Sequence, residues 1–423
     1  MSKKTNIYKW IEKAEPEMVE LQRLLTSVPA LSPDSGGDGE SAKAEALVSW
    51  CSDRGVEEIE NFPAPDERVS EGSRPNLVLT IPGQSDENAL WIMSHLDIVP
   101  PGEREKWSHE PYEIHIQDRR IYGRGTEDNQ QGIVSSLFAF LALREFGAVP
   151  SRTVKLLFVA DEEMGSRFGI QHLLREHDLF RSGDMFLVPD GGNSEGTMIE
   201  VAEKSVLWLE FTTTGKQCHA SRPELGKNAF LAGSELVVKL AGLEQIFPQT
   251  NPIFEPRAST FTPTKKTANV PNINTIPGID VFCLDSRILP EIPLDTVFSE
   301  IDRMCREVED AHGVTVSYKT VQRVESKATP AEAVIVERMK EAVRDVYGVS
   351  GKAVGIGGGT VAAYLRNAGY DTVVWARHDE TAHLPDEYCK IDNLVGDAKV
   401  MAHLMIEGLE SGTPCITLRG VRK

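Results

Sequence analysis

Cysteine is scarce in this 423-residue sequence, and its distribution argues against two kinds of site. The six cysteines lie far apart along the chain, and none belongs to a Cys-x-x-Cys pair. Such spacing disfavours a disulfide framework and a zinc site made of thiolates. We therefore expect reduced cysteines and a cytoplasmic protein; the six are Cys51, Cys218, Cys283, Cys305, Cys389 and Cys415.

Long apolar runs and an excess of positive charge are also missing. No stretch approaches the roughly 18 apolar residues of a membrane helix, and the lysines near the amino terminus precede no apolar run of signal-peptide length. Lysine and arginine number 45 against 64 aspartates and glutamates, which gives a formal net charge of −19. Because phosphate backbones are bound by basic surfaces, we expect neither a membrane nor nucleic acid as a partner.

The first half of the sequence shows a regular alternation of two kinds of segment. Short apolar segments with strand character alternate with longer segments of helical periodicity, which is typical of a mostly parallel sheet covered by helices. The stretch 7–30 predicts one amphipathic helix. The other expected helices are 40–55, 129–146 and 170–177, and the expected strands are 76–81, 89–94, 153–160 and 184–188.

The pattern changes near residue 204. Strands are expected at 206–214, around 257–264, at 279–287 and at 314–321, with helices at 228–246 and 294–312. This β-α-β-β-α-β order is that of a ferredoxin-like domain. Helix–strand alternation returns at 331–347 and 372–375. We therefore predict an α/β protein with one discontinuous domain, residues 1–204 and 324–423, and one inserted domain, residues 205–323.

Four short polar clusters follow the predicted strands of the larger domain. They are Ser-His-Leu-Asp at 94–97, Gly-Arg-Gly-Thr-Glu-Asp-Asn at 123–129, Asp-Glu-Glu-Met-Gly at 161–165 and Pro-Asp-Gly-Gly at 189–192. Ligands of open α/β sheets gather at the carboxyl ends of the strands, so we expect these clusters to share one site. Histidine and carboxylates without cysteine suit a catalytic zinc site that keeps a position open for water.

Each cluster taken singly has a simpler explanation. A histidine two residues before an aspartate is usually surface polarity, carboxylates after a strand can cap the next helix, and Asp190–Gly191 is a common turn dipeptide. Cys218 beside His219 could suggest a thiol nucleophile, but no base and orienting group accompany the pair. The metal-site interpretation therefore depends on the combination of clusters.

Together with Ala-His-Leu-Pro-Asp-Glu at 382–387, these motifs resemble the acetylornithine deacetylase, succinyl-diaminopimelate desuccinylase and glutamate carboxypeptidase family of two-zinc metallopeptidases. The resemblance runs in order from about 90 to 390, across nearly the whole chain. It implies a zinc-hydrolase catalytic domain with an inserted ferredoxin-like dimerisation or lid domain, and a homodimer formed through that insert. It also implies two Zn²⁺ ions per subunit, for which Co²⁺ or Mn²⁺ can substitute.

The resemblance assigns a role to each metal-ligand position. His95 and Asp190 would bind one zinc ion, Glu163 and His383 would bind the other, and Asp128 would bridge both. The family often has a cis peptide bond directly after the bridging aspartate, which here is the bond between residues 128 and 129.

Two further carboxylates receive roles in catalysis. Asp97 would orient the ring of His95, and Glu162 would act as general base and then as general acid. The adjacent Glu163 is expected as a ligand, so the two glutamates of the Asp-Glu-Glu cluster would have different tasks.

The inserted domain is expected to complete the active site. His219, in His-Ala-Ser-Arg-Pro, matches a family histidine that crosses the dimer interface and stabilises the oxyanion. Asn274, in Asn-Thr-Ile-Pro-Gly, matches a substrate-binding position in relatives.

Two more elements are expected to bind a substrate carboxylate. Arg287, in Leu-Asp-Ser-Arg, matches a substrate-binding position, and arginine suits bidentate capture of a carboxylate. The sequence Gly-Gly-Gly-Thr at 357–360 resembles the family's glycine-rich turn. The backbone N–H groups of Gly358, Gly359 and Thr360 could form an anion-binding nest.

The expected function is metal-dependent hydrolysis of the amide bond in a small N-acyl amino acid, of the deacetylase or desuccinylase type. Two alternatives stay open. A two-zinc exopeptidase acting on dipeptides or carboxy-terminal residues would share all these motifs. A non-catalytic homologue would lack a metal ligand or the base, and this sequence lacks neither.

Overall fold

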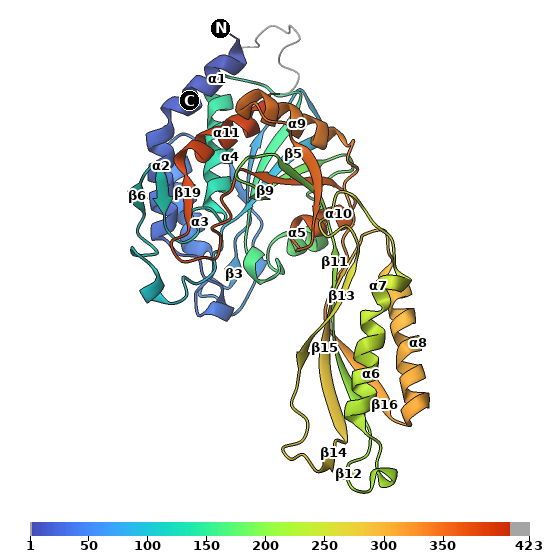
Figure 1. Cartoon of the computed structure of the whole chain (residues 1–423). Coiled ribbons are helices and arrows are strands. Elements are labelled where there is room, and N and C mark those ends of the chain that lie inside the picture. Colours follow the sequence, from blue (N-terminus) through green and yellow to red (C-terminus); the bar gives the residue numbers. More distant parts are fainter. Residues whose placement is uncertain (1, 407–423) are drawn as a thin grey trace. The chain divides into compact units, whose positions relative to one another are not determined.

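The computed structural model describes residues 2–406, which divide into two compact units (Figure 1). Within these residues the first unit comprises 2–201, 329–353 and 364–406. The second unit comprises Ala202–Ala328 and also Val354–Ala363. The glycine-rich turn at 357–360 therefore belongs to the same unit as Arg287.

An eight-stranded mixed sheet, in the order β1-β4-β8-β5-β9-β18-β10-β17, forms the centre of the first unit. Its middle pairs, β8–β5, β5–β9 and β9–β18, are parallel, whereas β1–β4, β4–β8 and β18–β10 are antiparallel. The strands are β1 Ile59–Asn61, β4 Leu77–Ile81, β5 Ser85–His95, β8 Arg152–Val159, β9 Met185–Gly192, β10 Met198–Glu203, β17 Lys352–Ile356 and β18 Asp371–Ala376.

The sheet is α/β, as predicted, but mixed rather than mostly parallel. The connections explain the difference. Parallel neighbours require a crossover of a dozen or more residues, whereas only residues 82–84 separate β4 from β5 and only 193–197 separate β9 from β10. Chain reversals this short place β4 and β10 antiparallel to the central strands. Apolar periodicity alone does not report strand direction.

Helices surround this sheet and supply much of the buried core. Helix α4 is buried around almost its whole circumference and contacts β5, β8, β9 and α11, which is typical of a core helix rather than a surface helix. The helices of the first unit are α1 Lys3–Lys13, α2 Glu15–Ser27, α3 Ser41–Ser52, α4 Gln130–Glu145, α5 Ile170–Glu176, α9 Val334–Tyr347 and α11 Ile391–Met405, and the short α10 Ala362–Asn367 crosses the boundary between the units.

The single amino-terminal helix expected at 7–30 is two helices. Helix α1 ends at Lys13, and α2 begins at Glu15 with Pro16 in its first turn. Proline lacks a backbone N–H and is well tolerated only where a helix begins, so Pro16 favours a new helix at this point. The amphipathic pattern continues through the break because both helices bury one face.

Two small sheets that the sequence did not predict also belong to the first unit. The strands β6 His115–Gln117, β7 Arg120–Tyr122 and β19 Tyr388–Lys390 form one antiparallel sheet. The pairing of β7 with β19 anchors the segment before Asp128 beside the segment after His383. The other small sheet pairs β2 Ala64–Pro65 with β3 Ser73–Arg74.

The second unit has a four-stranded antiparallel sheet in the order β13-β15-β11-β16 and two longer helices. Helix α8 buries residues three or four apart, from Leu294 to Val308, and ends at Gly313 with φ 62°. The elements are β11 Ser205–Thr214, β12 Cys218–His219, α6 Ala229–Ala241, α7 Leu243–Ile246, β13 Thr260–Lys266, β14 Thr275–Ile276, β15 Ile279–Ile288, α8 Leu294–His312 and β16 Thr315–Val324.

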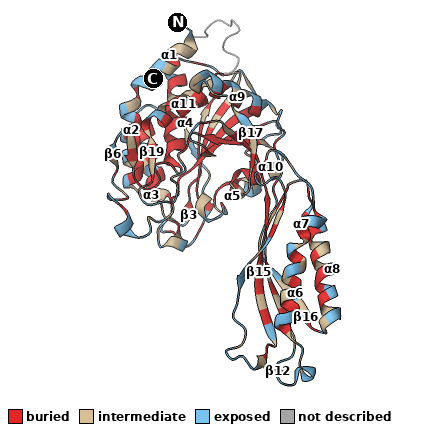
Figure 2. Ribbon diagram, in the orientation of Figure 1, coloured by how far each residue is buried: buried red, intermediate tan, exposed pale blue. Residues whose placement is uncertain are grey.

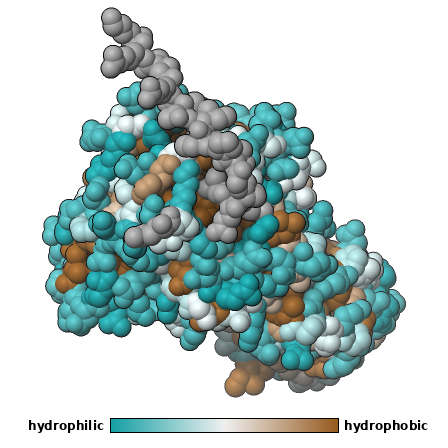
Figure 3. Space-filling view, turned by 90° about the horizontal axis from the view of Figure 1, so that it is seen from above, coloured by the Kyte–Doolittle hydropathy of each residue, from teal (hydrophilic) through white to brown (hydrophobic). Residues whose placement is uncertain are grey.

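Each unit has a buried interior, and much of the surface is polar. Figure 2 shows buried residues along the strands and the inward sides of the helices in each unit. The face drawn in Figure 3 is largely hydrophilic, in keeping with the high charge of the chain. Among the described helices, none combines the length and the apolar composition needed to cross a bilayer.

Candidate active site

Three neighbouring parallel strands bring predicted site residues to one edge of the large sheet. Strand β5 ends at His95, and β8 is followed by a 3-10 helix, Glu162–Met164, that contains Glu162 and Glu163. Asp190 lies near the end of β9. Because β5 pairs in parallel with both other strands, the carboxyl ends of all three lie side by side.

Asp128 and His383 join this group from segments outside the parallel strands. Asp128 lies just before α4, and its peptide bond to Asn129 is cis, as expected from the resemblance. His383 lies in the loop between β18 and β19, with 55% of its side chain exposed. Asp128 Oδ1 is 2.9 Å from His95 Nε2, and Asp128 Oδ2 is 3.1 Å from His383 Nε2.

The remaining two carboxylates lie on opposite sides of Asp128. Asp190 Oδ1 is 3.5 Å from His95 Nε2, and Glu163 Oε2 is 3.1 Å from His383 Nε2. Contacts within the described residues thus divide the five side chains into two groups that share Asp128. We call these five residues the histidine–carboxylate cluster.

Asp97 is bonded to the backbone of two residues at the site. Its two carboxylate oxygens accept the backbone N–H groups of Glu162 and Glu163, both at 3.0 Å. His95 Nδ1 is 3.0 Å from the backbone carbonyl of Asp97 and 3.5 Å from its carboxylate. Since a carbonyl can only accept, neutral His95 carries its hydrogen on Nδ1, which leaves the Nε2 lone pair directed into the cluster.

Both histidines of the cluster favour the protonated state in the absence of cations. Burial lowers the pKa of His95, but the carboxylates of Asp190 and Asp128 outweigh burial and hold this pKa well above its usual value. Hydrogen bonds to Asp128 and Glu163 raise the pKa of His383 to about 10. The two imidazoles therefore supply the positive charge that faces the carboxylates here.

The carboxylates in and beside the cluster are crowded, and their pKa values reflect this. Burial, followed by the charge of Asp190, raises the pKa of Glu162 well above its usual value. Burial also raises the pKa values of Glu163 and Asp190, which lie close to Asp128. Divalent cations would compensate this concentration of negative charge more fully than protons do.

Unsatisfied acceptors test whether the cluster fits metal ions. Glu163 Oε1 and Asn129 Oδ1 are buried and have no hydrogen-bond partner within the described residues. A buried acceptor without a donor costs free energy, and a cation beside Glu163 would satisfy its orphan oxygen. The donor set, imidazole nitrogens and carboxylate oxygens without thiolate, is one that a pair of divalent transition-metal ions can use.

His219 and Asn274, predicted separately, lie together in the second unit. Strands β12 and β14 pair His219 with Thr275, and the Ala220 N–H donates to the Asn274 carbonyl at 2.8 Å. The Ser221 N–H donates to His219 Nδ1 at 3.2 Å, so the neutral ring carries its hydrogen on Nε2. Both His219 and Asn274 are exposed.

Arg287 and the glycine-rich turn form another group in the second unit. Arg287 Nε and Nη2 donate to Asp285 at 2.8 and 3.2 Å, and Nη1 donates to the Gly357 carbonyl at 3.1 Å. The backbone N–H and the hydroxyl of Thr360 donate to the carboxylate of Glu203 at 2.8 and 2.6 Å. The anion held at Thr360 is therefore Glu203, which sequence reasoning did not identify.

Two buried glutamates beside the cluster also escaped the sequence analysis. Glu127 and Glu387 lie inside the motifs at 123–129 and 382–387, where the sequence analysis gave them no role. Both are almost fully buried and bond to backbone N–H groups next to the cluster. Their place in the same motifs as Asp128 and His383 was the sequence feature that could have pointed to them.

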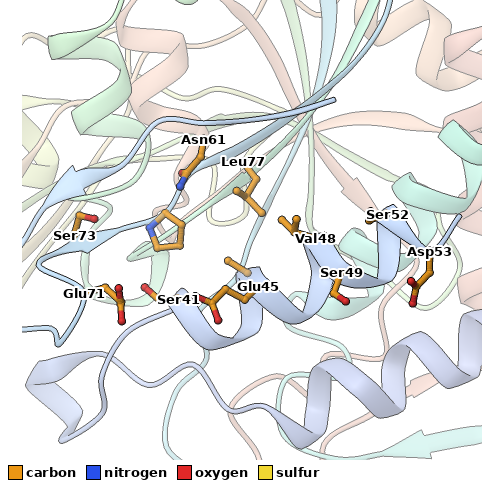
Figure 4. A pocket seen from close by; sticks show the side chains of 12 residues that line it. Ser41, Glu45, Val48, Ser49, Ser52, Asp53, Asn61, Glu71, Ser73 and Leu77 are labelled. Atoms are coloured by element: carbon orange, nitrogen blue, oxygen red, sulfur yellow. The ribbon is translucent and has the colours of Figure 1, made fainter. Parts of the chain in front are cut away.

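A separate groove of about 540 Å³ lies in the first unit, between α3 and strands β1, β3 and β4 (Figure 4). Serines and the carboxylates of Glu45, Asp53 and Glu71 line it together with a few apolar side chains, and no basic side chain does. None of the predicted site residues borders this groove, so it is distinct from the histidine–carboxylate cluster.

Comparison with known proteins identifies the family. The model described as peptidase family M20/M25/M40 matches residues 91–407. An uncharacterized metallohydrolase of Methanococcus maripaludis is 38% identical over 416 residues, covering 92% of this chain and 98% of that protein. Succinyl-diaminopimelate desuccinylase of Nitratiruptor sp. is 23% identical over 377 residues, covering 88% and 94%.

Solved structures share the fold. Aminopeptidase PepT from Bacillus cereus has a TM-score of 0.75 at 18% identity, covering 93% of this chain and 98% of that one. The YXEP protein of Bacillus subtilis, described as a dinuclear metal-binding peptidase, has a TM-score of 0.65 at 16% identity and the same coverage.

Histidines and carboxylates gathered at the carboxyl ends of an α/β sheet are typical of a metal-dependent hydrolase. The family match now makes the assignment specific: the chain belongs to peptidase family M20/M25/M40. It is thus an enzyme of the metallopeptidase and amidohydrolase class.

Proposed function

We propose that the protein is a two-zinc hydrolase that cleaves the amide bond of a small N-acyl amino acid. The convergence of the histidine–carboxylate cluster on Asp128 is the observation that supports this most. His95 and Asp190 would hold one ion, His383 and Glu163 would hold the other, and Asp128 would contact both. A relative named as a desuccinylase supports the acyl-group substrate.

Glu162 would carry the proton during hydrolysis. Bound zinc ions would polarise the substrate carbonyl and lower the pKa of a water molecule. Glu162 would accept a proton from that water at its carboxylate as the water oxygen attacks the carbonyl carbon. It would then give the proton to the amine nitrogen as the carbon–nitrogen bond breaks. Asp97 holds the backbone N–H of Glu162 and so orients the base.

The domain organisation is part of the proposal. Residues 1–204 and 324–423 would form the catalytic domain, and residues 205–323 would form an inserted ferredoxin-like domain. The chain order β11-α6-β13-β15-α8-β16 supports this assignment. The insert would form a homodimer, and His219 of one subunit would donate from Nε2 to the developing oxyanion in its partner.

An apolar face on α6 supports dimer formation through the insert. The side chains of Phe230, Leu231 and Val238 are 48%, 56% and 73% exposed. Leu231 and Val238 are seven residues apart and therefore share one side of the helix. A second copy of the chain would cover these side chains, because grouped exposed apolar residues are typical of interaction surfaces.

A free carboxylate on the substrate would bind at Arg287. Arginine has five N–H donors, so those not used by Asp285 and the Gly357 carbonyl remain for a ligand. Since Thr360 holds Glu203, the turn would offer the backbone N–H groups of Gly358 and Gly359.

Zinc is the proposed metal, with Co²⁺ or Mn²⁺ as substitutes, and the cytoplasm is the proposed location. All five cysteines within the described residues are free thiols, which is typical of a reducing compartment. Cys415 lies outside the described residues.

A substrate panel tests the proposal. Purified protein supplied with Zn²⁺, Co²⁺ or Mn²⁺ is assayed against N-acetylornithine, N-succinyl-diaminopimelate and unblocked dipeptides. We expect the highest kcat/KM for an N-acyl amino acid. A preference for unblocked dipeptides would establish the exopeptidase alternative. No turnover with any metal would point to a non-catalytic homologue.

A further inference from the structure

Two buried glutamates connect the segment that carries Asp128 with the loop that carries His383. Glu127 directly precedes Asp128, and Glu387 follows His383 by four residues. Their exposed fractions are 1% and 0%. Each carboxylate bonds to the backbone of the other segment, so the two contacts are reciprocal. Buried carboxylates are costly unless fully hydrogen-bonded, and both of these are.

Glu127 holds the loop that carries His383. Its Oε1 accepts the backbone N–H of Asp379 at 2.7 Å. Its Oε2 accepts the backbone N–H groups of Thr381 and of Ala382, the latter at 3.1 Å, and the Thr381 hydroxyl at 2.8 Å. One side chain thus satisfies four donors in the residues that lead directly to His383.

Glu387 holds the segment that carries Asp128. Its Oε1 accepts the backbone N–H groups of Glu127 and Asp128 at 3.0 and 3.1 Å. Its Oε2 accepts the Gly125 N–H at 3.1 Å and also bonds to the Arg124 guanidinium. The carboxylate therefore fixes the backbone of Asp128 itself.

The conformation of the His383 loop explains why it needs such contacts. Glu380, His383 and Asp386 have φ values of 60°, 64° and 55°, in the left-handed region that residues with a Cβ rarely adopt. A loop keeps such a conformation only where surrounding bonds determine it. In the described structure, Glu127 supplies several of those bonds.

We propose that Glu127 and Glu387, which we call the glutamate clasp, are positioning residues for the metal ion that Asp128 and His383 would share. Their side chains bond to backbone N–H groups rather than to the imidazole or carboxylate atoms of the cluster. The clasp fixes the two segments so that Asp128 Oδ2 and His383 Nε2 lie 3.1 Å apart. This inference rests on the proposed function, because it requires that the cluster binds metal.

Glu127→Gln and Glu387→Gln test the clasp, with Glu380→Gln as the matched control. Glutamine keeps the shape but turns an NH₂ group towards backbone N–H donors. Glu380 is exposed and lies in the same loop, so its variant makes the same charge change without touching the clasp. Metal-stripped protein is titrated with Co²⁺ and followed by visible absorption, with a thermal melt of the metal-free protein as the check of folding.

We expect wild type and Glu380→Gln to bind two Co²⁺ ions per chain with the same affinities. Each clasp variant is expected to bind one ion about 10 to 100-fold more weakly, the usual effect of removing the partner of a metal ligand. The other ion is expected to be weakened less, since it shares Asp128 but its other ligands, His95 and Asp190, belong to other segments.

Several outcomes would contradict the proposal. Unchanged affinities for both ions, or equal weakening of both in a folded variant, would overturn the clasp. If the wild-type protein binds no Co²⁺ at all, the proposed function itself is contradicted, and the clasp with it. If the glutamine variants do not fold, Thr381→Val removes one donor to Glu127, and normal binding of both ions by that variant overturns the inference.

Discussion

Asp128 is the residue at which the two halves of the candidate site meet. Its Oδ1 faces His95, and its Oδ2 faces His383. Glu162 has no hydrogen bond to either histidine, yet its carboxylate lies within 4.8 Å of ligand atoms on His95 and Asp190. Glu162 is therefore placed to serve as a base, and also close enough to be a ligand instead.

Glu162→Gln distinguishes these two roles. We expect this variant to retain two metal ions per chain, while kcat falls by at least about 10³-fold, because glutamine cannot accept the proton of the attacking water. Metal content is measured by mass spectrometry and kcat with the best substrate of the panel. The exposed Glu176→Gln serves as control. Loss of one metal ion from Glu162→Gln would show that Glu162 is a ligand.

Arg287 gives a prediction about substrate charge. A charge-assisted hydrogen bond contributes about 1.5–3 kcal/mol, so Arg287→Met should lower kcat/KM for a carboxylate substrate about 10 to 100-fold. The same substrate with a primary amide in place of the carboxylate should respond much less. The control is Arg303→Met, on the exposed side of α8. An equal loss for both substrates would argue against carboxylate binding at this residue.

At the scale of residues, the sequence predicted which side chains lie together, but it did not predict the buried carboxylates that fix the backbone around them. His95, Asp128, Glu163, Asp190 and His383 lie in motifs at the ends of predicted strands, and they do converge. Glu203, Glu127 and Glu387 were missed because a buried carboxylate bonded to backbone N–H groups has no periodicity or spacing of its own. The N–H groups that it bonds to are brought to it by the tertiary structure.

At the scale of elements, strand ends and short connections determine the site. The parallel neighbours β8, β5 and β9 bring their carboxyl ends together, and β7 pairs with β19 to bring the Asp128 and His383 segments side by side. Strand positions were largely predicted from apolar segments. Strand direction and the small β6-β7-β19 sheet were not, because three-residue strands carry too short a pattern.

Asp397 connects three helices, and its raised pKa leads us to predict that the stability of the fold depends on pH. It lies on α11 and accepts hydrogen bonds from Tyr347 on α9 and Gln131 on α4, at 2.7 and 2.8 Å. Burial raises the pKa of Asp397 to about 6. Between about pH 4 and pH 6 the folded protein therefore keeps a proton that the unfolded chain has released, so this group destabilises the fold as pH rises.

Asp397→Asn should remove that contribution. Relative to wild type, we expect the variant to gain about 3 kcal/mol in free energy of unfolding between pH 4 and pH 7, at about 1.4 kcal/mol per pKa unit. The Tyr347 hydroxyl can turn to accept from the new amide, so the packing is preserved. Urea denaturation at the two pH values measures the difference. An identical pH dependence in both proteins would contradict the prediction.

At the scale of the whole molecule, the chain forms two compact units, and the predicted site residues are divided between them. The histidine–carboxylate cluster lies in the first unit, whereas His219, Asn274, Arg287 and the glycine-rich turn lie in the second. The sequence predicted a change of pattern near residue 204. It did not reveal that Val354–Ala363 joins the second unit, because that segment is short and far along the chain.

Val238→Asp tests the proposed homodimer. A charge on the exposed face of α6 should oppose the contact between two copies, so we expect a monomer by light scattering at micromolar concentration. Turnover should fall with it if His219 acts in the partner's site. Val334→Asp, at an exposed valine of the first unit, is the matched control. A dimeric Val238→Asp variant would exclude this face of α6 as the interface.

The most direct measurement is an anomalous diffraction map, collected at the zinc edge, from crystals of the protein loaded with Zn²⁺. The account predicts two peaks, one between His95 and Asp190 and one between His383 and Glu163, each about 2.0–2.2 Å from its ligand atoms and both in contact with Asp128. A map with no peak among these five side chains, or with zinc bound elsewhere, would contradict it.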